Sequence, residues 1–128
     1  MLTDKPLPGF WCECWTQDLT DDTERPTLHA SFDAYTATQA DRWVATTLRT
    51  ITPALDPDAS DQAWHWLYSS RIKTRRALLS LEPCAVSVTQ ANTRITWTIR
   101  PVRFLPLAHR QRIELPACAH DFKPHTSD

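Results

Sequence analysis

The spacing of apolar residues along this chain changes from every second residue to a helical period, and then back again. Residues 10–17 alternate with large apolar groups on both faces, which favours a strand that is central or covered on both sides over one that is half exposed. Residues 27–35 alternate more cleanly, and one of their faces is made of Leu28, Ala30, Phe32 and Ala34. This second segment predicts a strand with one buried face and one solvated face.

The middle of the chain has the helical period. Thr36 and Gln39 match a capping box, in which two side chains satisfy backbone N–H groups at a helix start. After this cap, residues recur at helical spacing and form one face of a predicted helix, which Pro53 ends. This face is made of Ala40, Trp43, Val44, Thr47, Leu48 and Ile51. A second helix is expected over residues 61–72, where the apolar stripe is broader.

The last third of the chain returns to the strand period. Residues 77–83 form a short apolar run that favours a strand, although a helix end also fits it. Residues 84–89 and 94–100 predict a β-hairpin with an inner face made of Ile95, Trp97 and Ile99. Beyond Pro101 the apolar positions change parity, which predicts a bulge or the end of the strand near this proline.

Together these segments give the order β-β-α-α-(β)-β-β, with a further short strand near residues 112–115. We therefore predict an α+β fold, in which an antiparallel sheet of about four to six strands has two helices packed on one face. The chain of 128 residues suits a single globular domain over 1–128, with frayed ends near 1–8 and 119–128. No stretch is apolar enough to span a bilayer or to serve as a signal peptide, so we expect a cytoplasmic protein.

Gly9 is the only glycine in the chain. Phosphate loops, dinucleotide fingerprints and the G-x-S-x-G turn all need several glycines, so these sites are excluded in their usual forms. His29 is the best candidate base, but Asp33 lies four strand residues away, or roughly 13 Å, which is too far for contact. His65 lies between two tryptophans, where packing against a sheet is the favoured interpretation. We expect no catalytic residues, no cofactor and a non-enzymatic protein.

Cysteine and histidine residues near the two ends of the chain offer one metal pattern. Cys12, Cys14, Cys118 and His120 form a C-x-C pair and a C-x-H pair that could close a zinc site. The usual spacing is wider, because a turn must wrap the ion, and alternate strand residues have little freedom to converge. We therefore favour buried free thiols and a metal-free protein.

Charge is divided unevenly along the chain. Residues 1–61 hold 4 basic and 11 acidic side chains, whereas residues 62–128 hold 10 basic and 4 acidic ones. Such asymmetry fits either a binding surface for an acidic partner or two halves that neutralise each other in the fold. The chain also uses eleven arginines and only three lysines, which suggests a GC-rich coding genome and a bacterial or phage origin.

Six tryptophans are more than the core of a small domain usually absorbs, so we expect some of them to be exposed. Exposed aromatic side chains beside arginines are typical of protein interfaces. The residues that we assign to partner binding are Arg71, Lys73, Arg75, Arg76, Arg94, Arg100, Trp66 and Tyr68. Our hypothesis is an adaptor, inhibitor or accessory factor that binds another protein. The alternative is a DNA- or RNA-binding module that uses the basic segment 71–76 and the hairpin arginines.

Overall fold

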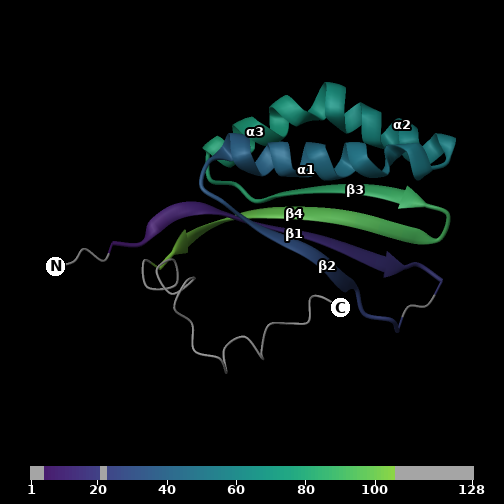
Figure 1. The fold of residues 1–128 in the computed structure, drawn as a ribbon, viewed down its shortest axis with the longest axis horizontal. Helices are drawn as coiled ribbons and strands as arrows, with labels where there is room; N and C mark the ends of the chain where they lie inside the picture. The colour runs from purple at the N-terminus through teal and green to yellow at the C-terminus, as the bar shows by residue number, and fades with distance from the viewer. Residues whose placement is uncertain (1–4, 21–22, 106–128) are drawn as a thin grey trace.

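The computed structural model describes residues 5–20 and 23–105, which form a four-stranded antiparallel sheet with helices on one face (Figure 1). The elements confirm the α+β prediction and follow the order β1 (Leu7–Asp18), β2 (Thr27–Ala34), α1 (Ala37–Ile51), α2 (Pro57–His65), α3 (Arg71–Leu79), β3 (Cys84–Gln90) and β4 (Thr93–Phe104). A 3-10 turn (Thr52–Ala54) follows α1, and a π-helical turn (Trp66–Ser70) joins α2 to α3. Among these residues, no helix is long and apolar enough to cross a membrane.

The first helix begins as the capping box predicted. The Thr36 hydroxyl accepts the backbone N–H of Gln39 at 3.0 Å, and the Gln39 side chain accepts the N–H of Tyr35 at 2.7 Å. The predicted inner positions Val44 and Leu48 are fully buried. The sequence therefore placed both the start and the buried face of α1 correctly.

The second helical stretch is longer than predicted, because α2, the π turn and α3 are continuous over residues 57–79. It starts at Pro57, where the side chain of Asp56 accepts the N–H of Ala59 at 2.8 Å. The strand expected over residues 77–83 was wrong, since this apolar run is the end of α3 and buries Leu78 in the core. Leu81, with a positive φ of 61°, then reverses the chain towards β3.

β1 and β4 occupy the centre of the sheet, whose strand order is β2-β1-β4-β3. β4 pairs with β1 from Leu7 to Asp18, which confirms that the aromatic-rich segment is a central strand. The predicted hairpin is also confirmed, because β3 and β4 are antiparallel neighbours. In the described part of the chain, helices cover only one face of β1, because α1, α2 and α3 all lie on one side of the sheet (Figure 1).

The expected irregularity at Pro101 is absent, because β4 continues in regular pairing with β1 as far as Phe104. β3 begins at Cys84, opposite Ile99, so at Pro101 the β3 side of β4 lies beyond the end of that strand. A proline can occupy such an edge because no ladder hydrogen bond is needed from its nitrogen on that side. Val102 and Phe104, the apolar residues that change the parity, are half-buried and belong to the regular strand rather than to a bulge.

β2 differs most from its predicted form. Its pairing with β1 shifts between Cys14 and Trp15, so that Ala30 faces Cys14 while Leu28 faces Trp15. This bulge places Leu28 on the opposite face of the sheet from Ala30, although their spacing predicted one shared face. Phe32 is 37% exposed and Leu28 is 43% exposed, so the predicted buried face reduces to Ala34 and its surroundings.

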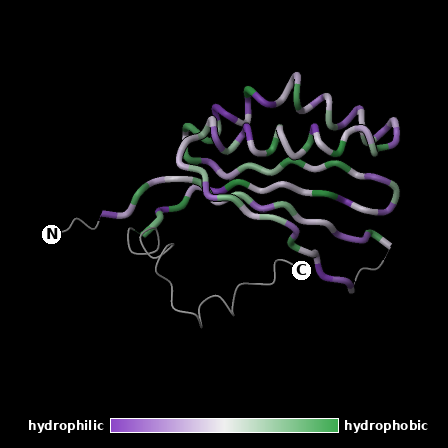
Figure 2. Tube along the Cα trace, in the orientation of Figure 1, coloured by the Kyte–Doolittle hydropathy of each residue, from purple (hydrophilic) through white to green (hydrophobic). Residues whose placement is uncertain are grey.

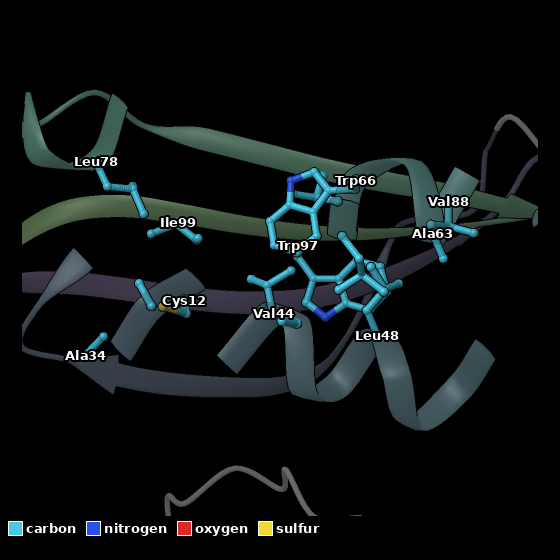
Figure 3. Packing of buried hydrophobic residues seen from close by; sticks show 14 of the residues in the cluster. Cys12, Ala34, Val44, Leu48, Ala63, Trp66, Leu78, Val88, Trp97 and Ile99 are labelled. Carbon is cyan, nitrogen blue, oxygen red and sulfur yellow. The ribbon is translucent and has the colours of Figure 1, made fainter. Parts of the chain in front are cut away.

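The core lies between the sheet and the helices (Figure 3). Apolar and polar residues alternate along the strands (Figure 2), and the apolar set faces α1 and the π turn. Trp97 is only 1% exposed, and its indole N–H donates to the Thr47 hydroxyl at 2.8 Å. The other side chains that the strands bury in this core are Phe10, Cys12, Ala34, Val86, Val88 and Ile99.

Gly9 lies where a side chain from β4 crosses β1. A Cβ atom on Gly9 would meet the ring of Phe104 and would lie 2.6 Å from the Ala34 carbonyl oxygen. The Phe104 ring also contacts Tyr35, with 5.1 Å between the ring centroids. The only glycine of the chain is thus required by close packing at this end of the sheet.

Candidate functional site

The face of the sheet that the helices leave uncovered, called the open face from here on, carries aromatic and charged side chains. Strand pairing assigns to it Trp11, Glu13, Trp15 and Gln17 of β1, and Arg100, Thr98, Thr96 and Arg94 of β4 directly opposite them. The neighbouring β3 adds only the short side chains Ala85, Ser87 and Thr89. The two tryptophans on β1 therefore project further from the sheet than the short side chains of β3 and of the centre of β4.

A carboxylate connects these two tryptophans. The indole N–H of Trp11 donates to one oxygen of Glu13 at 2.8 Å, and that of Trp15 donates to the other oxygen at 3.1 Å. All three side chains are half-buried. Their polar atoms are thus satisfied within β1, and the indole rings are held in fixed positions on a surface that no described helix covers.

A groove of about 490 Å³ lies beside Trp15 on the open face. Thr96 and Thr98 of β4 line it, together with Arg94 and with Arg25 and Pro26 of the segment before β2. Both arginines are exposed. Within the described residues, no carboxylate forms an ion pair with Arg25, Arg94 or Arg100, because the ion pairs found there all belong to Asp41.

Two of the predicted partner-binding arginines form part of the fold instead. Arg71 and Arg75 of α3 both hydrogen-bond through Nε to the carboxylate of Asp41 on α1, the second at 2.7 Å. Asp41 is fully buried, and its hydrogen bond and charge raise the pKa of Arg75. Because these guanidinium groups satisfy a buried carboxylate, they tie α3 to α1.

The other predicted site residues lie on two different surfaces. Trp66 is 6% exposed, and its indole N–H donates to Thr74, so it belongs to the core. Tyr68 is 76% exposed and stacks on Trp64, while Lys73 and Arg76 are exposed nearby. Arg94 and Arg100 lie on the open face, on the far side of the sheet from the helices. The structure therefore does not bring the predicted set together.

Sequence reasoning missed Asp41 and the importance of Trp11 and Trp15. The alternation over residues 10–17 does place Trp11, Glu13 and Trp15 on one face. The open character of that face could not be derived, because it depends on which side the helices pack. Asp41 follows Ala40 within the predicted buried stripe of α1, and a carboxylate beside core positions is a usable signal for a buried ion pair.

The cysteines of the described chain show no sign of catalytic or metal chemistry. Burial raises the pKa of Cys12 to about 12 and that of Cys14 to about 11, so neither is a ready nucleophile. Within residues 5–20 and 23–105, no cluster of three or more histidine, cysteine or acidic side chains is placed to hold a metal ion. Cys118 and His120 lie outside the described residues, and so does the strand expected near 112–115.

The histidines have ordinary surroundings. His29 is exposed on β2, and its Nε2 shares a hydrogen bond of 2.6 Å with the Thr16 hydroxyl. His65 is exposed at the end of α2, near Asp61 and Lys73. Neither histidine is held by a carboxylate in the arrangement that a general base requires.

No family model, no curated protein and no solved structure matches this chain. The geometry of its own surfaces therefore carries the functional argument.

Proposed function

We propose that this protein is a non-enzymatic adaptor, inhibitor or accessory factor of bacterial or phage origin, which binds another protein through the open face of its sheet. One observation carries the proposal: Glu13 fixes Trp11 and Trp15 on a face of the sheet that no described helix covers, between exposed arginines. Ordered aromatic side chains lose little conformational entropy on binding, and tryptophan and arginine dominate the energetics of protein interfaces. A cytoplasmic location belongs to the same proposal, and Cys12, Cys14 and Cys84 are free thiols as a reducing compartment would keep them.

Several features favour a protein partner over nucleic acid. Arg71 and Arg75 are engaged with Asp41, and Trp66 is buried, so the basic segment offers few groups for phosphates and bases. Arg94 and Arg100 lie on the other side of the sheet from that segment. Between them on the open face stands the carboxylate of Glu13, which would repel a phosphate backbone. Charges of both signs around an aromatic centre suit a protein surface better.

A photo-cross-linking experiment tests this proposal. The photoreactive amino acid p-benzoylphenylalanine replaces Thr98 on the open face or, in a second protein, Tyr68 on the helix surface. Each purified chain is irradiated in an extract of the source organism. We expect a discrete protein adduct from position 98 and little or none from position 68. Excess unlabelled wild-type protein should abolish the adduct, whereas excess Trp15→Thr protein should not.

Three results would contradict the proposal. An adduct at position 68 alone would move the interface to the helices. An adduct that the Trp15→Thr protein competes away as well as wild type would remove the indole from the interface. Retention on immobilised single-stranded DNA or RNA that weakens steeply with salt, together with nuclease-sensitive cross-links, would favour the nucleic-acid alternative.

A further inference from the structure

The side chains at and beside the Trp15 groove change in character from one end of the strands to the other. Three successive cross-strand rows of the open face are Gln17 with Arg94, Trp15 with Thr96, and Glu13 with Thr98. Successive rows on one face lie about 7 Å apart, because each strand residue advances about 3.4 Å. The surface thus changes from positive to aromatic to negative over about 14 Å.

Arg25 strengthens the positive end of this series. It lines the same groove as Arg94, and neither of them forms an ion pair with any other described residue. Glu13 lies just beyond the other end of the groove, opposite the lining residue Thr98, and its carboxylate accepts both indole N–H groups. An anionic group entering the groove is therefore attracted to the Arg25 and Arg94 end and repelled from the Glu13 end.

We propose that this groove binds an extended segment of the partner in which an apolar side chain and an acidic side chain are separated by one residue. This inference rests on the proposed protein-binding function and specifies the chemistry of the partner. Side chains at i and i+2 of an extended chain point the same way about 7 Å apart, which matches the distance between the Trp15 row and the Arg94 row. The apolar group packs on the indole of Trp15 and beside Pro26, and the carboxylate binds Arg94 and Arg25.

The charge and spacing of the groove distinguish this partner from the other occupants. A nucleic acid that followed the strands would place phosphates along the groove and past its Trp15 end beside Glu13, where the charges repel. A second copy of this chain would have to offer an acidic strand with the same spacing. The sheet has two edge strands: β2 has a single acidic residue, Asp33, whose open-face neighbour Ser31 is polar, and β3 has no acidic residue. An acidic, partly apolar protein segment matches the Trp15 row and the Arg94 row and places no anion at the Glu13 row.

Peptide titration of the full-length chain tests the inference. A ten-residue peptide of serine, with one leucine and one glutamate two positions apart, is added to ¹⁵N-labelled protein. Binding is followed by the indole N–H signal of Trp15, which the Trp15→Phe variant identifies. The control peptide has the same composition with the two residues adjacent, so that they point to opposite faces, and a third peptide has glutamine in place of glutamate.

We expect the spaced peptide to bind at least about tenfold more tightly than either control, since a charge-assisted pair is lost or misplaced in each of them. Arg94→Ala should weaken its binding by a similar factor. Arg76→Ala, which removes the same charge from the exposed end of α3, should leave binding unchanged.

Equal affinity for the spaced and adjacent peptides would overturn the spacing, and equal affinity for the glutamine peptide would overturn the acidic partner. Equal losses from Arg94→Ala and Arg76→Ala would mean that only net charge matters, which also overturns the inference. If no peptide binds while position 98 still gives a competed protein adduct, this inference fails and the proposed function stands. If that adduct is absent too, both fail.

Discussion

Both faces of the sheet carry tryptophans, but the indole N–H groups find their hydrogen-bond acceptors in different ways on the two faces. On the helix side, Trp97 is 1% exposed, and its indole N–H donates to Thr47 of α1 across the core. On the open face, Trp11 and Trp15 are half-buried, and both donate to Glu13 of their own strand. One face satisfies its tryptophan through the tertiary fold, and the other satisfies its tryptophans locally.

This difference shows which residues the fold depends on. The N–H partner of Trp97 exists only when α1 is docked, so that tryptophan and the helix stabilise each other. The indole N–H groups of the open face both donate to Glu13 of their own strand, so their hydrogen bonds do not depend on the docking of α1. Arg94 and Arg100 lie on the same side as these indoles and form no ion pair with a described residue, whereas Arg71 and Arg75 on the helix side are engaged with Asp41.

The largest contrast is expected from a negative charge placed on each face of β4. Ile99→Glu puts a carboxylate where the side chain is 1% exposed, and we expect it to unfold the protein. Thr96→Glu puts the same charge on the open face, and we expect a loss of less than about 1 kcal/mol. Urea denaturation followed by circular dichroism measures both. A tolerated Ile99→Glu with an unfolded Thr96→Glu would mean that the faces are assigned the wrong way round.

A smaller loss is expected when the helix side loses volume without gaining charge. Leu48 of α1 is fully buried, and Leu48→Ala should cost about 2 to 5 kcal/mol of unfolding free energy by leaving a cavity. Thr46→Ala, two residues away on the exposed side of α1, is the matched control and should change little. A loss well under 1 kcal/mol from Leu48→Ala would show that α1 is not part of the core.

The smallest effect concerns the thiols on the helix side of β1. Burial raises the pKa of Cys12 to about 12 from an ordinary value of 9.0, so the folded state holds this proton more tightly than the unfolded state. Its contribution to stability is therefore complete below about pH 9 and is lost progressively as the pH rises towards 12. Unfolding free energies at pH 8 and pH 10 should fall less in Cys12→Ala than in wild type. Parallel falls in the two proteins would show that Cys12 carries no such contribution.

Local patterns predicted much of the fold. The capping box and stripe of α1 and the alternation of the hairpin each depend on neighbouring residues, and these elements were confirmed. Errors arose where tertiary context decided the outcome. The apolar run at 77–83 is too short to show its period. Pro101 is tolerated because β3 does not extend to the position opposite it. The bulge in β2 appears only when that strand pairs with β1.

The candidate site was less predictable for the same reason. Nearness in sequence grouped Arg71 and Arg75 with Trp66 and Tyr68, but helix geometry turns some of these residues towards α1 and others outward. Asp41, the partner of both arginines, lies 30 residues before Arg71 and 34 residues before Arg75 in the chain. The composition predicted that some tryptophans are exposed, but only Trp64 is, while Trp11 and Trp15 of the candidate site are half-buried. The strand assignment alone did not show which face of the sheet would be left without helices.

The most direct test of this account compares one tryptophan from each face. Trp97→Thr and Trp15→Thr both keep a residue that suits a strand, and urea denaturation gives the unfolding free energy of each protein. We predict a loss of about 3 to 5 kcal/mol for Trp97→Thr and a loss of about 1 kcal/mol or less for Trp15→Thr. Similar losses for the two proteins would contradict the account, because both faces would then contribute equally to the core.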